Sequence, residues 1–233
     1  MTRLLEARGL RKVFAGGDGQ PLEVLRGVDL EVQRGEFVAI VGASGAGKST
    51  LLHLLGALDR PTAGDVWLDG SRYADLDGAT LAELRNRKLG FVFQFHHLLR
   101  EFSALENVML PLLIGGAAVR QARSRAEETL SLVGLAGRMA HRPAELSGGE
   151  QQRCAVARAL VHDPGVVLAD EPSGNLDHAN ADRLHDVFFR LAREYETAVV
   201  VVTHNRQLAG RADRILMLED GRVTAVGSVD AIP

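Results

Sequence analysis

Short, continuous apolar runs alternate with helical patterns through most of the chain. The apolar runs at 37–41, 66–68, 89–93, 166–169, 198–202 and 215–218 predict buried strands. Uniformly apolar strands of this length are typical of a parallel sheet that is covered on both faces. Helical patterns lie between them at 47–58, 79–87 and 178–195. This alternation predicts an α/β fold with a mainly parallel sheet.

The two ends of this pattern differ from its middle. Segments 4–9 and 23–32 predict two N-terminal strands, which are separated by the glycine-rich turn 16–19. Between about 96 and 163 only helical patterns occur, at 104–113, 120–133 and 148–161. We therefore expect a helical lobe inserted into the α/β core.

Composition narrows the class of protein. The 233 residues carry a net charge of −3, which argues against the strongly basic surface of a nucleic-acid-binding protein. We expect no nucleic-acid partner. Cys154 is the single cysteine, so no intrachain disulfide can form. We expect neither a signal peptide nor a membrane span, because the richest apolar segment, 105–119, is interrupted by polar residues, Pro111 and a Gly-Gly pair.

A glycine-rich loop joins the predicted strand 37–41 to the predicted helix 47–58. Its spacing, Gly-x-x-x-x-Gly-Lys-Ser, matches the Walker A pattern, in which backbone N–H groups curl around a phosphate at a helix N-terminus. Lys48 would place its ammonium beside the terminal phosphates, and the Ser49 hydroxyl can bind Mg²⁺. The predicted ATP-binding residues are Gly42, Ala43, Ser44, Gly45, Ala46, Gly47, Lys48, Ser49 and Thr50.

Further motifs flank this loop in a fixed order. They are Phe14, Gln94, the LSGG segment 146–149, Asp170 and Glu171 of a Walker B pattern, the SGNLD segment 173–177, and His204. This order resembles that of ABC ATPases from residue 14 to residue 204, which is nearly the whole chain. Walker A alone is shared with kinases, GTPases and helicases; the ordered set separates the ABC family from them.

Some of these motifs also have simpler interpretations. Ser147 and Glu150 match a helix capping box, which needs no ligand. A capped helix start is also an anion site, so both interpretations can hold for Ser147. Phe14 can be a core aromatic, and a single histidine such as His204 is more often structural.

The resemblance implies a P-loop NTPase cassette with a mainly parallel sheet core, an N-terminal antiparallel β subdomain and an inserted α-helical subdomain. We expect one domain over 1–233, with a nucleotide-binding core (1–95 and 164–233) and a helical signature lobe (about 96–163). It also implies an ATPase that pairs head to tail with a second copy. Ser147, Gly148 and Gly149 would then bind the γ-phosphate of ATP held by the other chain.

The resemblance further implies a role for each site residue. Glu171 is the expected general base, Lys48 would neutralise phosphoryl charge, and His204 would hold the γ-phosphate. Phe14 would stack on adenine, and Gln94 would contact both the metal and the attacking water. The expected Mg²⁺ ligands are Ser49, Gln94 and Asp170.

Segments 51–56, 91–99, 106–108, 111–115 and 171–177 closely resemble LolD-type lipoprotein-release ATPases. That group implies LolC- and LolE-like integral membrane permeases as partners, docking near Gln94–Phe102. It also implies a peripheral position on the cytoplasmic face of the inner membrane. The apolar residues Phe95, Leu98, Leu99 and Phe102 would form the docking groove, or some would belong to the core of the lobe.

Two departures from the family pattern leave neighbouring groups open. Asn205 follows His204 where Asp is common, and Ser173 stands where Thr is more frequent. A MacB-type exporter or an FtsE-type cell-division signalling cassette is therefore an alternative. A soluble ABC ATPase of DNA repair or translation is more remote, because the roughly 100 residues between the Walker A and LSGG motifs leave no room for a long coiled coil.

Overall fold

The computed structural model describes residues 3–17 and 19–227. Every segment predicted above as a helix or strand forms the predicted type of element. The strands are β1 (Arg3–Ala15), β2 (Pro21–Gln33), β3 (Phe37–Val41), β4 (Ala63–Leu68), β5 (Ser71–Arg72), β6 (Leu89–Phe93), β7 (Val166–Asp170), β8 (Ala198–Val202), β9 (Arg214–Glu219) and β10 (Arg222–Val226). The helices are α1 (Lys48–Leu55), α2 (Gly78–Lys88), α3 (Ala104–Ile114), α4 (Val119–Leu132), α5 (Gly148–Leu160), α6 (His178–Glu194) and α7 (Arg206–Ala209).

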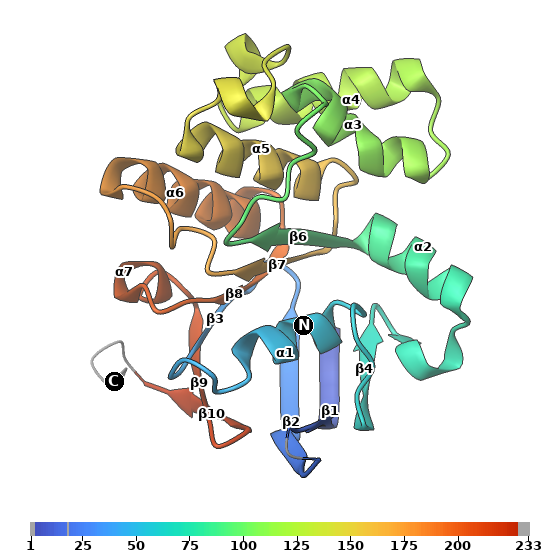
Figure 1. Cartoon of the computed structure of the whole chain (residues 1–233), viewed down its shortest axis with the longest axis vertical. Helices are drawn as coiled ribbons and strands as arrows, with labels where there is room; N and C mark the ends of the chain where they lie inside the picture. Colours follow the sequence, from blue (N-terminus) through green and yellow to red (C-terminus); the bar gives the residue numbers. More distant parts are fainter. Residues whose placement is uncertain (1–2, 18, 228–233) are drawn as a thin grey trace.

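The strands form two sheets. An antiparallel sheet has the order β2-β1-β4-β5, and a larger sheet has the order β10-β9-β3-β8-β7-β6. In the larger sheet β9, β3, β8, β7 and β6 run parallel, and β10 pairs antiparallel with β9. This is the expected parallel core beside an N-terminal antiparallel sheet (Figure 1).

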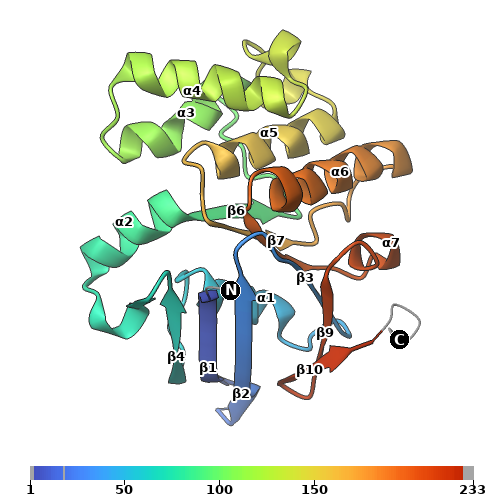
Figure 2. The same cartoon turned by 180° about the vertical axis from the view of Figure 1, so that it is seen from behind.

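Alternate residues of the buried core strands pack on opposite faces of the larger sheet, as the period of two requires. Ala39, Ala169 and Val201 belong to the cluster that includes α6 and the helical lobe. Ile40 and Val202 belong to the cluster that includes α1 and the antiparallel sheet. Figure 2 shows this layering, with α5 and α6 on one side of the core strands and α1, β1, β2 and β4 on the other.

Helices α3, α4 and α5 pack together into the lobe at one end of the molecule (Figure 1). Its interior is aliphatic, with Val108, Leu130 and Val156 fully buried. The side chain of Gln152 on α5 donates to the carbonyl of Phe93 at 2.9 Å. The lobe is therefore tied to the end of β6 as well as packed on the core.

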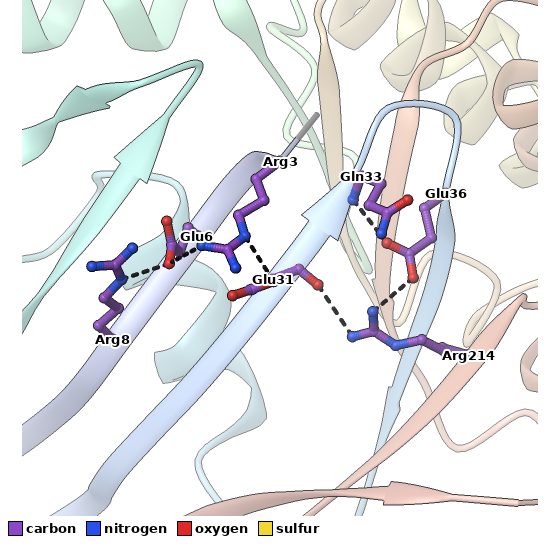
Figure 3. Close-up of polar contacts among 7 residues, drawn as sticks. All are labelled: Arg3, Glu6, Arg8, Glu31, Gln33, Glu36 and Arg214. Atoms are coloured by element: carbon purple, nitrogen blue, oxygen red, sulfur yellow. Dashed lines mark hydrogen bonds and ion pairs between the residues drawn. The ribbon is translucent and has the colours of Figure 1, made fainter. Parts of the chain in front are cut away.

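An exposed polar network joins the antiparallel sheet to the core (Figure 3). Arg214 at the start of β9 lies 2.9 Å from the Glu36 carboxylate and donates to the Glu31 carbonyl on β2 at 3.1 Å. Glu31 also pairs with Arg3 of β1 at 3.0 Å. A single exposed ion pair contributes little to the stability of the fold. The stabilising effect of this network therefore comes from Arg214, which bridges two elements that are far apart in sequence.

Three predicted boundaries are wrong by three residues or more, and one of them is the start of β4, which lies at Ala63 rather than at 66. Helix α1 ends at Leu55 rather than at 58, because Gly56 caps it and Ala57 turns left-handed at φ 53°. A side chain on Gly56 would meet the Phe91 ring at 2.3 Å, so helix and β6 approach too closely for another residue type. Strand β1 continues from the predicted end at 9 to Ala15, because the chain passes Gly9 through an irregularity in the pairing with β2.

The short elements β5, β10 and α7 were not predicted. The glycine-rich turn joins β1 to β2, with the Gly16 N–H bonded to the Gln20 carbonyl at 2.8 Å; Asp18 of that turn lies outside the described residues. No helix in the described ranges has the length and apolar character needed to cross a bilayer.

Candidate nucleotide site

The parallel register brings the predicted site residues to one edge of the larger sheet. Asp170 at the end of β7 lies opposite Phe93 of β6 and Val202 of β8, and Val202 lies opposite Ile40 of β3. The residues after these strands therefore share the carboxyl edge, where open α/β sheets bind ligands. This placement joins Gln94, Glu171 and His204 to the glycine-rich loop, although they are far apart in sequence.

The glycine-rich loop has the backbone of a phosphate cradle. Gly47, the N-cap of α1, adopts φ 99°, and a Cβ there would meet Val24 at 2.7 Å, so only glycine fits. Lys48 donates from Nζ to the carbonyls of Gly42 at 2.8 Å and Ala43 at 2.9 Å. Its ammonium is thus held over the loop, within reach of an anion that the backbone N–H groups would bind.

Glu171 is held in a strained geometry beside His204. Its backbone adopts φ 44°, an uncommon conformation for a residue with a side chain. Its carboxylate lies 2.9 Å from His204 Nδ1 and 3.3 Å from both the Thr203 hydroxyl and the His204 N–H. The Glu171 side chain is only 17% exposed whereas that of His204 is 72% exposed. A mostly buried carboxylate is therefore in contact with a histidine at the surface.

Gln94 is engaged with the SGNLD segment. Its side-chain amide donates to Asn175 Oδ1 at 3.3 Å, and the Asn175 amide donates back to the Gln94 carbonyl at 3.3 Å. A Cβ on Gly174 would lie 3.1 Å from the Gln94 amide nitrogen. The start of the helical lobe is therefore linked to the segment that follows Glu171.

The glycine-rich loop and the residues that follow β6, β7 and β8 line a single cleft of about 570 Å³. Oxygen donors suited to Mg²⁺ lie in it: the Ser49 hydroxyl, the Gln94 amide carbonyl and the Asp170 carboxylate. The donor chemistry fits Mg²⁺, which commonly takes one or two protein carboxylates together with substrate phosphates. The predicted site residues in the lining are Gly42, Ser44, Gly45, Gly47, Lys48, Ser49, Thr50, Gln94, Asp170, Glu171 and His204.

The LSGG segment does not join this cleft. Ser147 caps α5 by accepting from the Glu150 N–H at 3.3 Å, and Glu150 accepts from the Ser147 N–H at 2.8 Å, so the predicted capping box is confirmed. Gly148 is exposed, with open space where a side chain would stand. The N-terminal end of a helix dipole favours an anion. Within the described residues no part of 146–149 lines the cleft.

Glu150 is strongly stabilised as a carboxylate. Arg138 donates to it at 2.8 Å, and together with the backbone N–H of Ser147 this lowers the pKa of Glu150 to about 2. The negative charge near the first turn of α5 complements the helix dipole. The helix start is therefore fixed by these contacts, with Ser147 and Gly148 exposed and Gly149 buried against Asn180.

Phe14 lies near the end of β1, outside the lining of the cleft, and is 41% exposed. The ammonium of Lys12 stands 5.0 Å from the centre of its ring and pairs with Asp59 at 2.7 Å. A cation held against one ring face orients the aromatic side chain. The ring is thus exposed and oriented, as a base-stacking residue needs to be, and it is not a core residue.

The apolar residues after Gln94 divide between surface and core. Phe95 is 64% exposed, and Leu99 and Phe102 are also exposed, whereas Leu98 is buried in the helical-lobe core. Leu98 is therefore one of the residues that belong to the core of the lobe, as the sequence allowed, and Phe95, Leu99 and Phe102 remain at the surface.

A separate groove of about 390 Å³ lies between α2, β6, α3 and α5. Its lining includes Leu58, Phe91, Phe93 and Ile114, of which Ile114 is 76% exposed. The sequence interpretation missed this groove. The available signal was an apolar residue, Ile114, placed at the end of a helix directly before two glycines.

Comparison with known proteins agrees with this arrangement. A family model described as ABC transporter matches residues 25–174. The lipoprotein-releasing system ATP-binding protein LolD of Porphyromonas gingivalis is 53% identical over 94% of this chain and 97% of that protein. LolD of Geobacter metallireducens is 53% identical over 97% of this chain and all (100%) of that protein.

Solved structures show the same fold. A dimeric structure of the ATP-binding cassette MJ0796, in a post-hydrolysis state bound to ADP and phosphate, superposes with a TM-score of 0.87 at 39% identity, covering 94% of this chain and 96% of that one. The cassette cbiO1 of Clostridium perfringens, part of a complex called cbiONQ, gives a TM-score of 0.84 at 25% identity, covering 96% of this chain and 88% of that one.

Proposed function

Because the chain belongs to the ABC transporter family, among the LolD-type ATP-binding proteins, we propose that it is the ATP-hydrolysing subunit of a lipoprotein-release complex. The proposal that the chain hydrolyses ATP rests on the cleft in which the glycine-rich loop, Asp170, Glu171 and His204 meet. Phosphoryl transfer to water needs a phosphate cradle, a metal-binding carboxylate and a base for the attacking water, and each has a residue there.

Six residues of the cleft have a proposed part in hydrolysis. Lys48 leaves the carbonyls that it now contacts and neutralises charge on the terminal phosphates. Glu171 accepts a proton from the attacking water. His204 moves from Glu171 to the γ-phosphate, and this frees the carboxylate for the water. Mg²⁺, held by Ser49, Asp170 and Gln94, supplies further neutralisation of phosphate charge when bound.

We propose that the site is completed by a second copy of the chain. The LSGG segment lies outside the cleft, yet Ser147 and Gly148 are exposed at the capped start of α5, where the helix dipole favours an anion. In a head-to-tail dimer Ser147, Gly148 and Gly149 would reach ATP held in the partner's cleft, and the two-fold symmetry would give two equivalent sites. The dimeric form of the similar cassette MJ0796 supports this arrangement.

The docking surface for membrane permeases is proposed near Gln94. The exposed apolar residues Phe95, Leu99 and Phe102 lie there, and the groove lined by Leu58 and Ile114 adjoins the same strand, β6. An amphipathic helix of a LolC- or LolE-like permease would place its apolar face in this groove. The chain would then act as a peripheral subunit on the cytoplasmic face of the inner membrane.

Two experiments test the proposal. The purified chain should release phosphate from ATP in the presence of Mg²⁺, and the absence of any release would contradict the enzymatic part. Affinity purification from the native membrane should recover two lipoprotein-release permeases. Recovery of a single cell-division permease would replace lipoprotein release with a signalling function.

A further inference from the structure

His185 on α6 is a buried histidine that makes a single hydrogen bond to the part of the chain that the structure describes. Its side chain is completely buried, and its Nε2 lies 3.0 Å from the hydroxyl of Ser173, which is also buried. Nδ1 of His185 has no hydrogen-bond partner among the described residues. A buried polar atom without a hydrogen-bond partner lowers the stability of the fold. If residue 185 only filled the core, an apolar side chain would therefore be more stable there.

The contact has a defined direction. Burial lowers the pKa of His185, with Asp182, Asp186 and Arg211 as the nearby charges, so the ring is neutral. Protonation on Nε2 leaves only a lone pair unpaired at Nδ1, whereas the other tautomer would bury an unpaired N–H, which is the rarer situation. We therefore assign His185 Nε2–H as the donor and the Ser173 hydroxyl oxygen as the acceptor.

Ser173 stands in the turn that shapes the backbone of Glu171. The Gly174 N–H donates to the Glu171 carbonyl at 3.1 Å, and the Leu176 N–H donates to the Ser173 carbonyl at 3.1 Å. Glu171 itself has the strained φ of 44°. Strained conformations persist only where surrounding contacts fix them, and the hydrogen bond between His185 and Ser173 is one contact by which α6 holds this turn.

We propose that His185 is a positioning residue: through Ser173 it fixes the turn that follows Glu171 and thereby aims the Glu171 carboxylate at the attacking water. This inference rests on the proposed role of Glu171 as the base. The second contact on the same segment, between Asn175 and Gln94, fixes the far side of the turn. The segment 171–175 is thus held at two points, one on the core helix α6 and one at the start of the helical lobe.

The substitution His185→Phe separates positioning from packing. Phenylalanine keeps an aromatic ring among the apolar neighbours on α6, such as Phe188, and removes the unpaired Nδ1. Thermal stability should therefore be equal or higher. Turnover should fall about tenfold, because small displacements of a catalytic group are costly, while KM for ATP changes less than about twofold. If His185 served only to fill the core, the His185→Phe variant would keep the turnover of the wild type.

Two further variants keep the test decisive. His185→Gln retains a side-chain N–H donor and should recover part of the lost turnover. Ser173→Ala removes the other partner with a small change, so it tests the contact even if His185→Phe fails to fold. The double variant should be no slower than the slower single variant, since both remove the same contact.

The outcomes separate this inference from the proposed function. A wild-type chain without ATPase activity contradicts the proposed function itself. A wild-type chain that hydrolyses ATP, together with His185→Phe and Ser173→Ala variants that match its turnover within twofold, overturns the positioning role alone. Independent, multiplicative losses in the double variant also overturn it, because the two residues would then not act through one contact.

Discussion

The substitution Glu171→Gln removes a charge and a proton acceptor from the site while keeping its shape. The carboxylate now faces His204 Nδ1 at 2.9 Å, and the Thr203 hydroxyl and His204 N–H at 3.3 Å. A glutamine can place its side-chain carbonyl against the two donors and its amide group towards the His204 ring. The fold should therefore change in stability by no more than about 1 kcal/mol, and ATP should bind as before.

Turnover should respond quite differently. The amide of glutamine cannot accept a proton from water, so the contribution of the general base is lost. Such a base accelerates a reaction by about 10²- to 10⁴-fold, which corresponds to about 3 to 5 kcal/mol in the activation barrier. Because ATP binds and is not cleaved, the variant should accumulate as an ATP-bound dimer.

The assay is phosphate release from ATP under saturating Mg²⁺, with nucleotide affinity and dimer mass measured on the same samples. Glu196→Gln is the matched control, because Glu196 is also a glutamate at positive φ, 52°, but is exposed in the turn before β8. The control should hydrolyse ATP at the wild-type rate. Turnover by Glu171→Gln within tenfold of wild type would refute the assignment of the base.

Three other variants test separate parts of the account. Ser147→Arg should abolish turnover while the isolated chain still binds nucleotide, as measured by equilibrium binding and phosphate release. Tyr73→Phe removes a 2.9 Å bond to the Leu55 carbonyl at the end of α1 and should cost about 1 kcal/mol in a denaturant titration. Glu150 has a folded-state pKa of about 2, below its ordinary 4.5, so its carboxylate stabilises the fold above pH 4.5. That contribution is lost as the pH falls towards 2, so Glu150→Gln should flatten the dependence of stability on pH in this window, and an unchanged slope would contradict it.

Much of the fold followed from local patterns. Strands β3, β6 and β8 match their predicted bounds, because each is a fully apolar run that ends at a glycine or polar residue. The end of α1 was missed because the left-handed turn that follows it, at φ 53°, falls on Ala57, a residue type that ordinarily continues a helix. Strands β5 and β10 are short or exposed and carry little apolar signal of their own.

The residues of the site were easier to predict from the sequence than the contacts that hold them in place. Residues of the glycine-rich loop and Glu171 could be named because their chemistry requires particular residue types at fixed spacing. The contact between His185 and Ser173, and that between Gln94 and Asn175, join residues that no local pattern connects. The sequence could not divide Phe95, Leu98, Leu99 and Phe102 between groove and core for the same reason: whether an apolar side chain faces a groove or a core depends on neighbours from other elements.

The central claim is that each ATP site is shared between two copies of the chain, and complementation between two inactive variants tests it most directly. Lys48→Ala disables the loop and Ser147→Arg disables the LSGG segment, so each variant alone should release no phosphate. In an equimolar mixture, random pairing makes about half of the dimers mixed, each with one intact site of two, so about a quarter of the wild-type rate should return. A mixture that stays as inactive as its two components, although the mixed dimer is shown to form, would contradict a shared site.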